Sequence, residues 1–278
     1  MIRSFFIGML WLIVKRENIM RISFIGAGRV AHHLAHVLSQ HHHIIQIYSR
    51  SLEPAHTLAA QVGATATVNI CEINPEIDLV IIAVSDQAIA SVIAEVHQHL
   101  ADVLMVHTSG STDIEVLAKN HARAGVFYPL QTFSLDREIP WSDTPLFVEA
   151  NSEADLVLLT KLAYQLSHRV YQYTSAQRLS LHLAAVFACN FSNYCYDMAK
   201  QIVDTQQVDF SLLYPLILET ANKAVQHDPK QMQTGPAMRG DQNILNMHQQ
   251  ILDDAQREDL KNVYNLMSQQ ILQSHHPQ

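Results

Sequence analysis

The chain has 278 residues, of which 48% are hydrophobic and 16% are charged. This length suits one large domain or two of moderate size, and this composition excludes a disordered chain and a collagen-like one. The formal net charge is −8 and no block of Lys and Arg occurs, which argues against a nucleic-acid partner. Three cysteines without a C-x-x-C pattern argue against a disulfide framework and a zinc site, and favour a reducing compartment, the cytoplasm.

Residues 5–14 (FFIGMLWLIV) form a long apolar run near the N-terminus. The run has about half of the ~20 residues that cross a bilayer. A signal peptide would need a small-x-small cleavage site where Lys15 and Arg16 stand. We expect Met20 to be the natural start and residues 1–19 to be an N-terminal extension, with a short membrane or signal segment as the alternative.

Strand-like and helix-like segments alternate over residues 20–173. Apolar and β-branched runs predict strands at 21–25, 43–48, 78–84, 103–107, 125–128, 146–149 and 169–173. Helical spacing of apolar residues predicts helices at 28–40, 53–62, 87–100 and 153–167. Such alternation indicates an α/β fold, here a Rossmann-type domain with a mainly parallel sheet.

The sequence changes character after Tyr173. No convincing strand follows, and helical periodicity covers 176–203, 210–227, 242–254 and 257–273. We predict a second, all-helical domain over 174–278 for substrate binding or dimerisation. Its apolar residues, Leu216 and Ile251 among them, suggest a homodimer interface, although core packing would also explain them.

The segment 26–31 (GAGRVA) has the pattern G-x-G-x-x-A between the first predicted strand and the helix after it. In this context Gly26 permits the tight turn, Gly28 lets the backbone approach a pyrophosphate, and Ala31 allows close helix–strand packing. The free N–H groups of the helix N-terminus then face the anion. The residues expected to contact the cofactor from this turn and from the ends of later strands are Gly26, Ala27, Gly28, Arg29, Val30, Val84, Ser85 and Thr108.

The end of the second predicted strand indicates which cofactor is bound. An NAD site usually offers Asp or Glu there, whereas this chain has Ser49, Arg50 and Ser51, and no acid before Glu53. A guanidinium and two hydroxyls suit a 2′-phosphate. We therefore favour NADP(H) over NAD(H), with an Arg50 that only caps the next helix as the alternative.

Polar residues follow two strands whose carboxyl ends should lie at the ligand-binding edge of the sheet. Asp86 follows the run 78–84, and His107 ends the run 103–107. Asp86 is more typical of a helix N-cap than of a catalyst. His107 either assists catalysis or is a hydrogen-bonded structural histidine.

Histidine is abundant, with 17 residues, which we interpret as a compositional property of the surface. His32 and His36 have the i, i+4 spacing of metal ligands on a helix, but no third ligand is placed with them. We predict no metal site.

Four motifs together resemble a known family. They are GAGRVA at 26–31 with Ser49-Arg50, GVFYPLQTF at 125–133, HLAAVFACNF at 182–191 and TGPAMRGD at 234–241. The chain resembles oxidoreductases that join a Rossmann-like NADP-binding domain to the helical domain of unknown function 2520. That family is similar to pyrroline-5-carboxylate reductase, ketopantoate reductase and deazaflavin-dependent NADP oxidoreductases. The resemblance implies NADP-linked redox chemistry without a settled substrate.

Two positions depart from related patterns. Family members often carry His before Pro in the strand at 125–129, and this chain has Tyr128 there, so any role of that His is in doubt, although a phenol can still donate a hydrogen bond. The related β-hydroxyacid dehydrogenases place a catalytic Lys where this chain has Phe187. A hydroxyacid mechanism with a lysine acid/base is therefore unsupported.

A regular α-helix over 176–203 would place His182, Cys189 and Asn193 on one face. Asn193 would lie about 16 Å from His182 along the axis, and Asn190 about 12 Å away and turned by roughly 80°. His182 is the better proton donor because a histidine pKa near about 6.5 allows both forms at neutral pH. A satisfied core histidine is the alternative.

We predict an enzyme that transfers hydride between NADP(H) and a C=O or C=N centre of a small metabolite. The alternative is a catalytically inactive nucleotide-binding protein with a regulatory or scaffold role. The expected catalytic residues are His182, Asn190, His107 and Asp241, and the expected substrate contacts are Tyr128, Gln131, Asn193 and Arg239. Asp241 is equally well placed to cap the helix that follows it.

Overall fold

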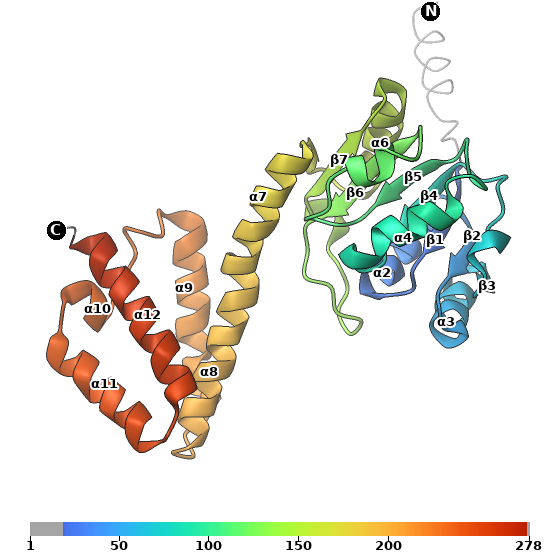
Figure 1. Ribbon diagram of the computed structural model, residues 1–278. Coiled ribbons are helices and arrows are strands. Elements are labelled where there is room, and N and C mark those ends of the chain that lie inside the picture. The colour runs from blue at the N-terminus through green and yellow to red at the C-terminus, as the bar shows by residue number, and fades with distance from the viewer. Residues whose placement is uncertain (1–18, 277–278) are drawn as a thin grey trace, which may run out of the picture. The chain divides into compact units, whose positions relative to one another are not determined.

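The computed structural model describes residues 19–276 (Figure 1). The apolar run at 5–14, and with it the predicted N-terminal extension apart from residue 19, lies outside the described residues. Two compact units divide between Val186 and Phe187. No helix in the described range combines the length and the apolar character needed to span a membrane.

The first unit is built on an eight-stranded sheet in the order β3-β2-β1-β4-β5-β6-β7-β8. All neighbouring strands are parallel except β6 and β7, so the mainly parallel Rossmann-type sheet is confirmed. The strands are β1 (Arg21–Ile25), β2 (His43–Tyr48), β3 (Thr65–Thr67), β4 (Leu79–Ile82), β5 (Leu104–His107), β6 (Ala124–Pro129), β7 (Leu146–Ala150) and β8 (Val170–Gln172).

Helices cover both faces of this sheet (Figure 1). Leu34, Leu58 and Leu159 bring α2, α3 and α6 into one apolar cluster, and Ile93 and Leu117 bring α4 and α5 into the other. Burial on both faces explains why β4 is a continuous apolar run. The helices of this unit are α2 (Arg29–Ser39), α3 (Leu52–Val62), α4 (Asp86–Val96), α5 (Glu115–Ala118), α6 (Glu153–Leu166) and α7 (Ser175–Ala185).

The strand order reverses between β1 and β4, because β2 and β3 extend the sheet on one side and the later strands extend it on the other. In open α/β sheets the crevice outside the carboxyl ends of the strands at such a switch point binds the ligand. The turn after β1 and the ends of β4, β5 and β6 all lie at this edge, since these strands run parallel.

Helix α7 belongs to the first unit, so the division into compact units falls one helix later than the predicted boundary at 173/174. Its start is fixed by a capping box, in which Thr174 N donates to Gln177 Oε1 at 3.0 Å and Gln177 N donates to Thr174 Oγ1 at 3.3 Å. Leu181 packs against the cluster of Val126 and Tyr128 on β6. These contacts attach α7 to the sheet.

The second unit contains helices and no strand among its described residues, as predicted. Met198, Leu252 and Leu260 form its buried core, whereas α9 has no buried side chain. The helices are α8 (Ser192–Asp204), α9 (Tyr214–Gln226), α10 (Pro236–Arg239), α11 (Gln242–Asp254) and α12 (Glu258–His275).

The predicted continuous helix over 176–203 is interrupted by a π-helix at Val186–Phe191. Ser192 Oγ bonds the carbonyl of Phe187, five residues back, at 3.4 Å. A π turn contains more residues than an α turn, so the regular rotation assumed between His182 and Asn193 does not hold. The predicted common face of these two residues assumed that regular rotation, so its basis is lost.

Candidate active site

The turn after β1 requires a glycine at its first position. Gly26 has φ +116°, and a Cβ atom there would lie 2.3 Å from the Ala83 carbonyl oxygen. Its N–H donates to the Tyr48 carbonyl at 2.8 Å, which ties the turn to the end of β2. Gly28 has an ordinary φ of −83° and open space where a Cβ would point. That space lets a ligand approach the backbone.

A pocket of about 420 Å³ opens beside this turn. Among the residues expected to contact the cofactor, it is lined by Gly26, Ala27, Gly28, Ser49, Arg50, Val84 and Ser85. Arg29, Val30, Ser51 and Thr108 do not line it. Ser91 and Glu95 of α4 do, and sequence reasoning missed both because nothing in the motif indicates that α4 reaches the pocket.

The end of β2 presents the Arg50 cation and the Ser49 hydroxyl to this pocket. The Arg50 side chain is exposed and has neither a hydrogen bond nor an ion pair within residues 19–276. Ser49 Oγ accepts from Ser51 N at 3.5 Å, and Ser51 precedes α3 without capping it through its side chain. The Glu95 carboxylate comes from α4 and not from β2.

These groups fit a dinucleotide. The first turn of α2 has no side-chain cap and no acidic residue, so its N–H groups are available to an anion. The open space at Gly28 allows a pyrophosphate to approach, and the free guanidinium of Arg50 lies on the same wall as Ser49. No other charged side chain of the described chain is bonded to that guanidinium.

Tyr128 and His182 meet at the carboxyl edge of the sheet. Tyr128 Oη lies 3.2 Å from His182 Nδ1, although the residues are 54 positions apart in the chain. Tyr128 is 8% exposed on β6 and His182 is half-buried on α7. Within the described residues His182 Nε2 has no hydrogen-bond partner.

Gly110, which follows β5, lies against this pair. A Cβ atom at Gly110 would lie 2.6 Å from His182 Nδ1 and 2.8 Å from Tyr128 Oη. A Cβ atom there would force Tyr128 or His182 to shift, so the glycine accommodates the Tyr128–His182 contact as it stands. Burial raises the pKa of Tyr128 to about 12, although the positive charge of Arg178 acts in the opposite direction. The phenol is neutral at physiological pH.

His107 fits one of the two roles that the sequence left open, that of a hydrogen-bonded structural histidine. It is completely buried, and its Nδ1 accepts a hydrogen bond from Ser109 N at 3.1 Å. Burial, reinforced by the charge of Arg178, lowers the pKa of His107 to about 3. Its Nε2 is buried and has no hydrogen-bond partner among the described residues. Its burial and the bond from Ser109 N favour the structural alternative, and a catalytic role of His107 stays a prediction.

Asp86 contacts the loop after β5, and Gln131 makes a local contact. Ser85 is the N-cap of α4 and Asp86 is its first residue, so the expected N-cap role of Asp86 is wrong by one position. The Asp86 carboxylate accepts a short hydrogen bond from Ser111 Oγ. Gln131 Oε1 accepts from the N–H of Thr132 at 2.8 Å.

The other predicted site residues belong to the second unit. Asn190 lies in the π-helix and Asn193 on α8, and both are exposed. Arg239, on α10, is exposed and makes no ion pair in the part of the chain that the structure describes. Asp241 caps α11, since its Oδ1 accepts from Ile244 N at 3.3 Å. Functional roles for these residues stay predictions.

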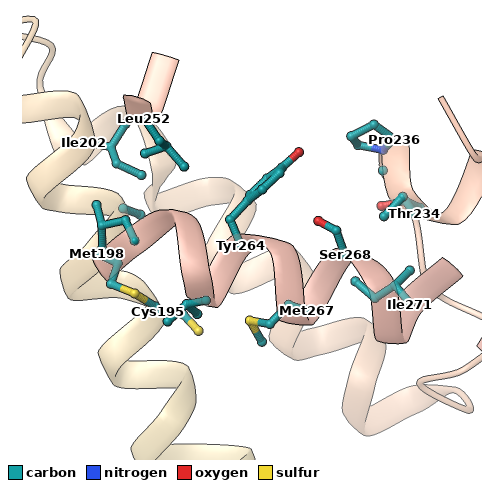
Figure 2. Close-up of a pocket in the computed structure, with 15 residues that line it drawn as sticks. Cys195, Met198, Ile202, Thr234, Pro236, Leu252, Tyr264, Met267, Ser268 and Ile271 are labelled. Carbon is teal, nitrogen blue, oxygen red and sulfur yellow. The ribbon is translucent and has the colours of Figure 1, made fainter. Parts of the chain in front are cut away.

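The second unit contains an apolar pocket of about 340 Å³ (Figure 2). Met198 and Ile202 of α8 and Met267 of α12 point into it. Thr234 and Pro236, at the start of α10, also line the pocket. The motif at 234–241 therefore shapes this pocket and caps α11.

Two family models match the chain. The model for NADP oxidoreductase, coenzyme F420-dependent, matches residues 21–110, and the model for the domain of unknown function 2520 matches residues 144–271. Among solved structures, the Bacteroides fragilis protein BF3122, provisionally described as an NADP oxidoreductase, is 40% identical. That match covers 92% of this chain and 98% of the other, with a TM-score of 0.84. The chain belongs to this family of NADP oxidoreductases.

More distant reductases share the fold of this oxidoreductase. An imine reductase from Myxococcus stipitatus, in complex with NADP+, is 15% identical over 90% of this chain and 92% of the other, with a TM-score of 0.68. A pyrroline-5-carboxylate reductase from Coxiella burnetii is 16% identical over 91% and 99%, with a TM-score of 0.55. Curated proteins give no match.

Sequence reasoning missed Arg178, the most deeply buried charge among residues 19–276. It is 1% exposed and pairs with Glu149 at 2.6 Å. One signal could have found it, because Arg178 is the only Asp, Glu, Lys or Arg between Arg169 and Asp197. A lone charge on a helix that otherwise lacks charge indicates a specific partner.

Proposed function

We propose that this oxidoreductase uses NADPH to reduce a C=N or C=O bond of a small metabolite, with His182 as the proton donor. The observation that carries the proposal is the contact of 3.2 Å between Tyr128 Oη and His182 Nδ1. The contact lies at the same edge of the sheet as the turn at Gly26, because β1, β4, β5 and β6 run parallel. Solved imine and pyrroline-5-carboxylate reductases with this fold support C=N as the reduced bond.

When bound, NADPH supplies the hydride that the carbon of the C=N or C=O bond accepts. His182 supplies the proton that the nitrogen or oxygen of that bond needs. In its protonated form the ring directs Nδ1–H to Tyr128 Oη, so Nε2–H is left to meet the substrate. After Nε2 has given up its proton the ring is neutral, and solvent restores the proton before the next turnover.

Tyr128 orients the His182 ring and, as a neutral phenol, does not hold the imidazolium proton in an ion pair. A phenolate beside His182 would hold the imidazolium proton as an ion pair, whereas the raised pKa of Tyr128, about 12, keeps the phenol neutral. The hydrogen bond also fixes which ring nitrogen faces the substrate.

The preference for NADP(H) over NAD(H) is part of the proposal. Arg50 is free of protein partners within residues 19–276 and lines the pocket together with Ser49. A guanidinium binds phosphate oxygens through forked, charged hydrogen bonds. The 2′-phosphate of NADPH is the group that these two side chains would hold.

The test is NADPH consumption with a panel of cyclic imines, 1-pyrroline-5-carboxylate included, and of ketones. We expect His182→Ala to keep the affinity for NADPH and to lose turnover by about 100-fold or more. His248→Ala is the matched control, because His248 Nδ1 bonds Tyr264 Oη at 2.9 Å in the second unit. Undiminished turnover in His182→Ala would exclude His182 as the donor, and tight NADPH binding without turnover of any compound would contradict the proposed reduction.

We propose further that the enzyme is a homodimer formed through α9. This helix has no buried side chain, and Leu216, Leu218 and Val225 are each more than half exposed on it. An apolar helix surface of this kind marks a protein interface. A second copy suits it, because a two-fold interface uses the same patch from both chains.

A further inference from the structure

Arg178 of α7 is a cation enclosed in the first unit. Burying a charge is costly unless it is paired and all its donors are bonded. The pairing is with Glu149 of β7, whose Oε2 lies 2.6 Å from Nη1. Nη2 also donates to Ser175 Oγ at 3.1 Å, in the first turn of α7.

The same guanidinium holds the loop after β5 at two points. Nε donates to the Ser109 carbonyl at 3.2 Å, and Nη2 donates a short hydrogen bond to the Thr112 carbonyl. One planar group therefore joins β7, this loop and α7. A lysine ammonium could not span these acceptors, because it is a point donor on a flexible stem.

The two bonded carbonyls flank Gly110, the residue that supports the Tyr128–His182 contact. Arg178 and His182 are four residues apart on α7, so their side chains lie on the same face of the helix. The bonds of Arg178 thus set how closely α7 approaches the loop, and with it the distance from His182 to Tyr128.

We propose that Arg178 is the positioning residue of the Tyr128–His182 pair, because its guanidinium fixes the loop at 109–112 against α7 and so keeps Gly110 under the pair. The inference rests on the proposed role of His182 as proton donor. Arg178 acts through the loop and does not touch the substrate. Its charge also influences the pair, since it counteracts the effect of burial on the pKa of Tyr128.

The first test needs no substrate. In a long-range ¹H–¹⁵N spectrum of the histidine rings, the His182 signal is assigned by its loss in His182→Asn. We expect Arg178→Lys to shift this signal from one tautomer toward an average of the two, and we expect Tyr128→Phe, which removes the hydroxyl that contacts Nδ1, to do the same. Arg123→Lys is the matched control, because Arg123 pairs with the buried Asp155 carboxylate in the same unit. An unchanged His182 signal in Arg178→Lys would overturn the proposal.

The second test uses a substrate found in the imine and ketone panel. We expect Arg178→Lys to lower kcat by about 10- to 100-fold, as a misplaced catalytic group does, with an unchanged Kd for NADPH. If His182→Ala and Tyr128→Phe lose turnover while Arg178→Lys keeps it, the positioning role fails and the proposed function stands. If His182→Ala retains turnover, the proposed function itself fails.

A milder variant distinguishes the loss of His182 positioning from a general folding defect of Arg178→Lys. Glu149→Gln removes the charge that pairs with Arg178 and keeps one acceptor oxygen. We expect a smaller displacement of the His182 signal in the same direction, recorded without urea in a chain that is still folded. The urea unfolding midpoint should be lower, because the buried guanidinium loses its counter-charge. A His182 signal identical to that of the unsubstituted chain would contradict the proposed positioning role of Arg178.

Discussion

Gly26 and Gly28 lie two positions apart in one turn, yet a methyl group would meet quite different surroundings at each. At Gly26 the methyl would collide with the Ala83 carbonyl on a backbone with φ +116°. At Gly28 it would meet open space on a backbone with φ −83°. The backbone of the protein itself requires the first glycine, whereas we propose that a bound ligand requires the second.

Substitution should separate these two requirements. We expect Gly26→Ala to lower the free energy of unfolding by about 2 kcal/mol or more, through strain and the contact with Ala83. Gly28→Ala should cost less than about 1 kcal/mol. It should nevertheless weaken NADPH binding by about tenfold or more, since the added carbon occupies the space of the pyrophosphate. Urea unfolding and calorimetric titration measure both effects, and unaltered NADPH affinity in Gly28→Ala would remove the pyrophosphate from this turn.

Arg50 should decide between the two nicotinamide cofactors. We expect Arg50→Ala to weaken NADPH binding by about 10- to 100-fold, the value of a charged hydrogen bond or two. NADH binding should change little, because NADH lacks the 2′-phosphate. Arg137→Ala, which removes an exposed guanidinium from a different pocket, is the control. Parallel losses for NADPH and NADH in Arg50→Ala would rule out recognition of the 2′-phosphate.

His107 should make the first unit sensitive to acid. Its pKa in the folded chain, about 3, is below the value near 6.5 in the unfolded chain, so the unfolded state binds an extra proton between these values. Stability from this group is present above about pH 6.5 and is lost as the pH falls toward 3, by up to about 1.4 kcal/mol per pH unit. His107→Asn keeps an acceptor for Ser109 N and does not titrate. Urea unfolding from neutral to acid pH should show a shallower decline in that variant, and identical declines would refute this explanation.

Asp241 was expected to cap the helix that follows it or to assist catalysis, and the structure shows the cap. Its carboxylate accepts the hydrogen bond from Ile244 N that begins α11. We expect Asp241→Ala to destabilise the chain by about 1 kcal/mol, whereas Asp241→Asn, which keeps the cap, should match the unsubstituted chain. Thermal unfolding of the two variants makes the comparison. A loss of turnover in Asp241→Asn without a loss of stability would instead favour catalysis.

Elements with a strong local signal were predictable from the sequence. The buried apolar runs gave β4 and β5 to within a residue or two, and the periodic segment at 242–254 gave α11 with both ends correct. β3 was not predicted, because three residues carry too little periodicity. The π-helix at Val186–Phe191 was not predicted for another reason. An extra residue in a turn leaves the amino-acid composition typical of a helix, so the sequence carries no sign of it.

The candidate site was predictable in its parts and not in its assembly. Tyr128 and His182 were both expected at the site, the first as a substrate contact and the second as a catalyst. Their meeting depends on α7 packing against β6, a contact between segments distant in sequence. Gly110 and Arg178 contribute only through that contact. No local pattern could assign them a role, since what defines them is the space and the acceptors that other segments provide.

If two chains associate, the mass measured by sedimentation should be twice that of one chain. We expect the enzyme to sediment at twice its 31.4 kDa, and Leu216→Glu to convert it to the single chain by placing a charge on the exposed face of α9. Leu135→Glu is the matched control, because Leu135 is 61% exposed and Leu216 is 62% exposed. Sedimentation of the unsubstituted enzyme as a single chain would dismiss the dimer.

The lack of room at Gly110 offers a way to sort other proteins of this family from their sequences alone. A single added carbon would overlap both the phenol and the imidazole. A relative with a side chain at the corresponding position would have to move the phenol or the imidazole, even if it retains both aromatic residues, and this would disturb the tyrosine–histidine contact. If His182 donates the proton as proposed, such a protein should place its proton donor differently, and this one position predicts which relatives do so.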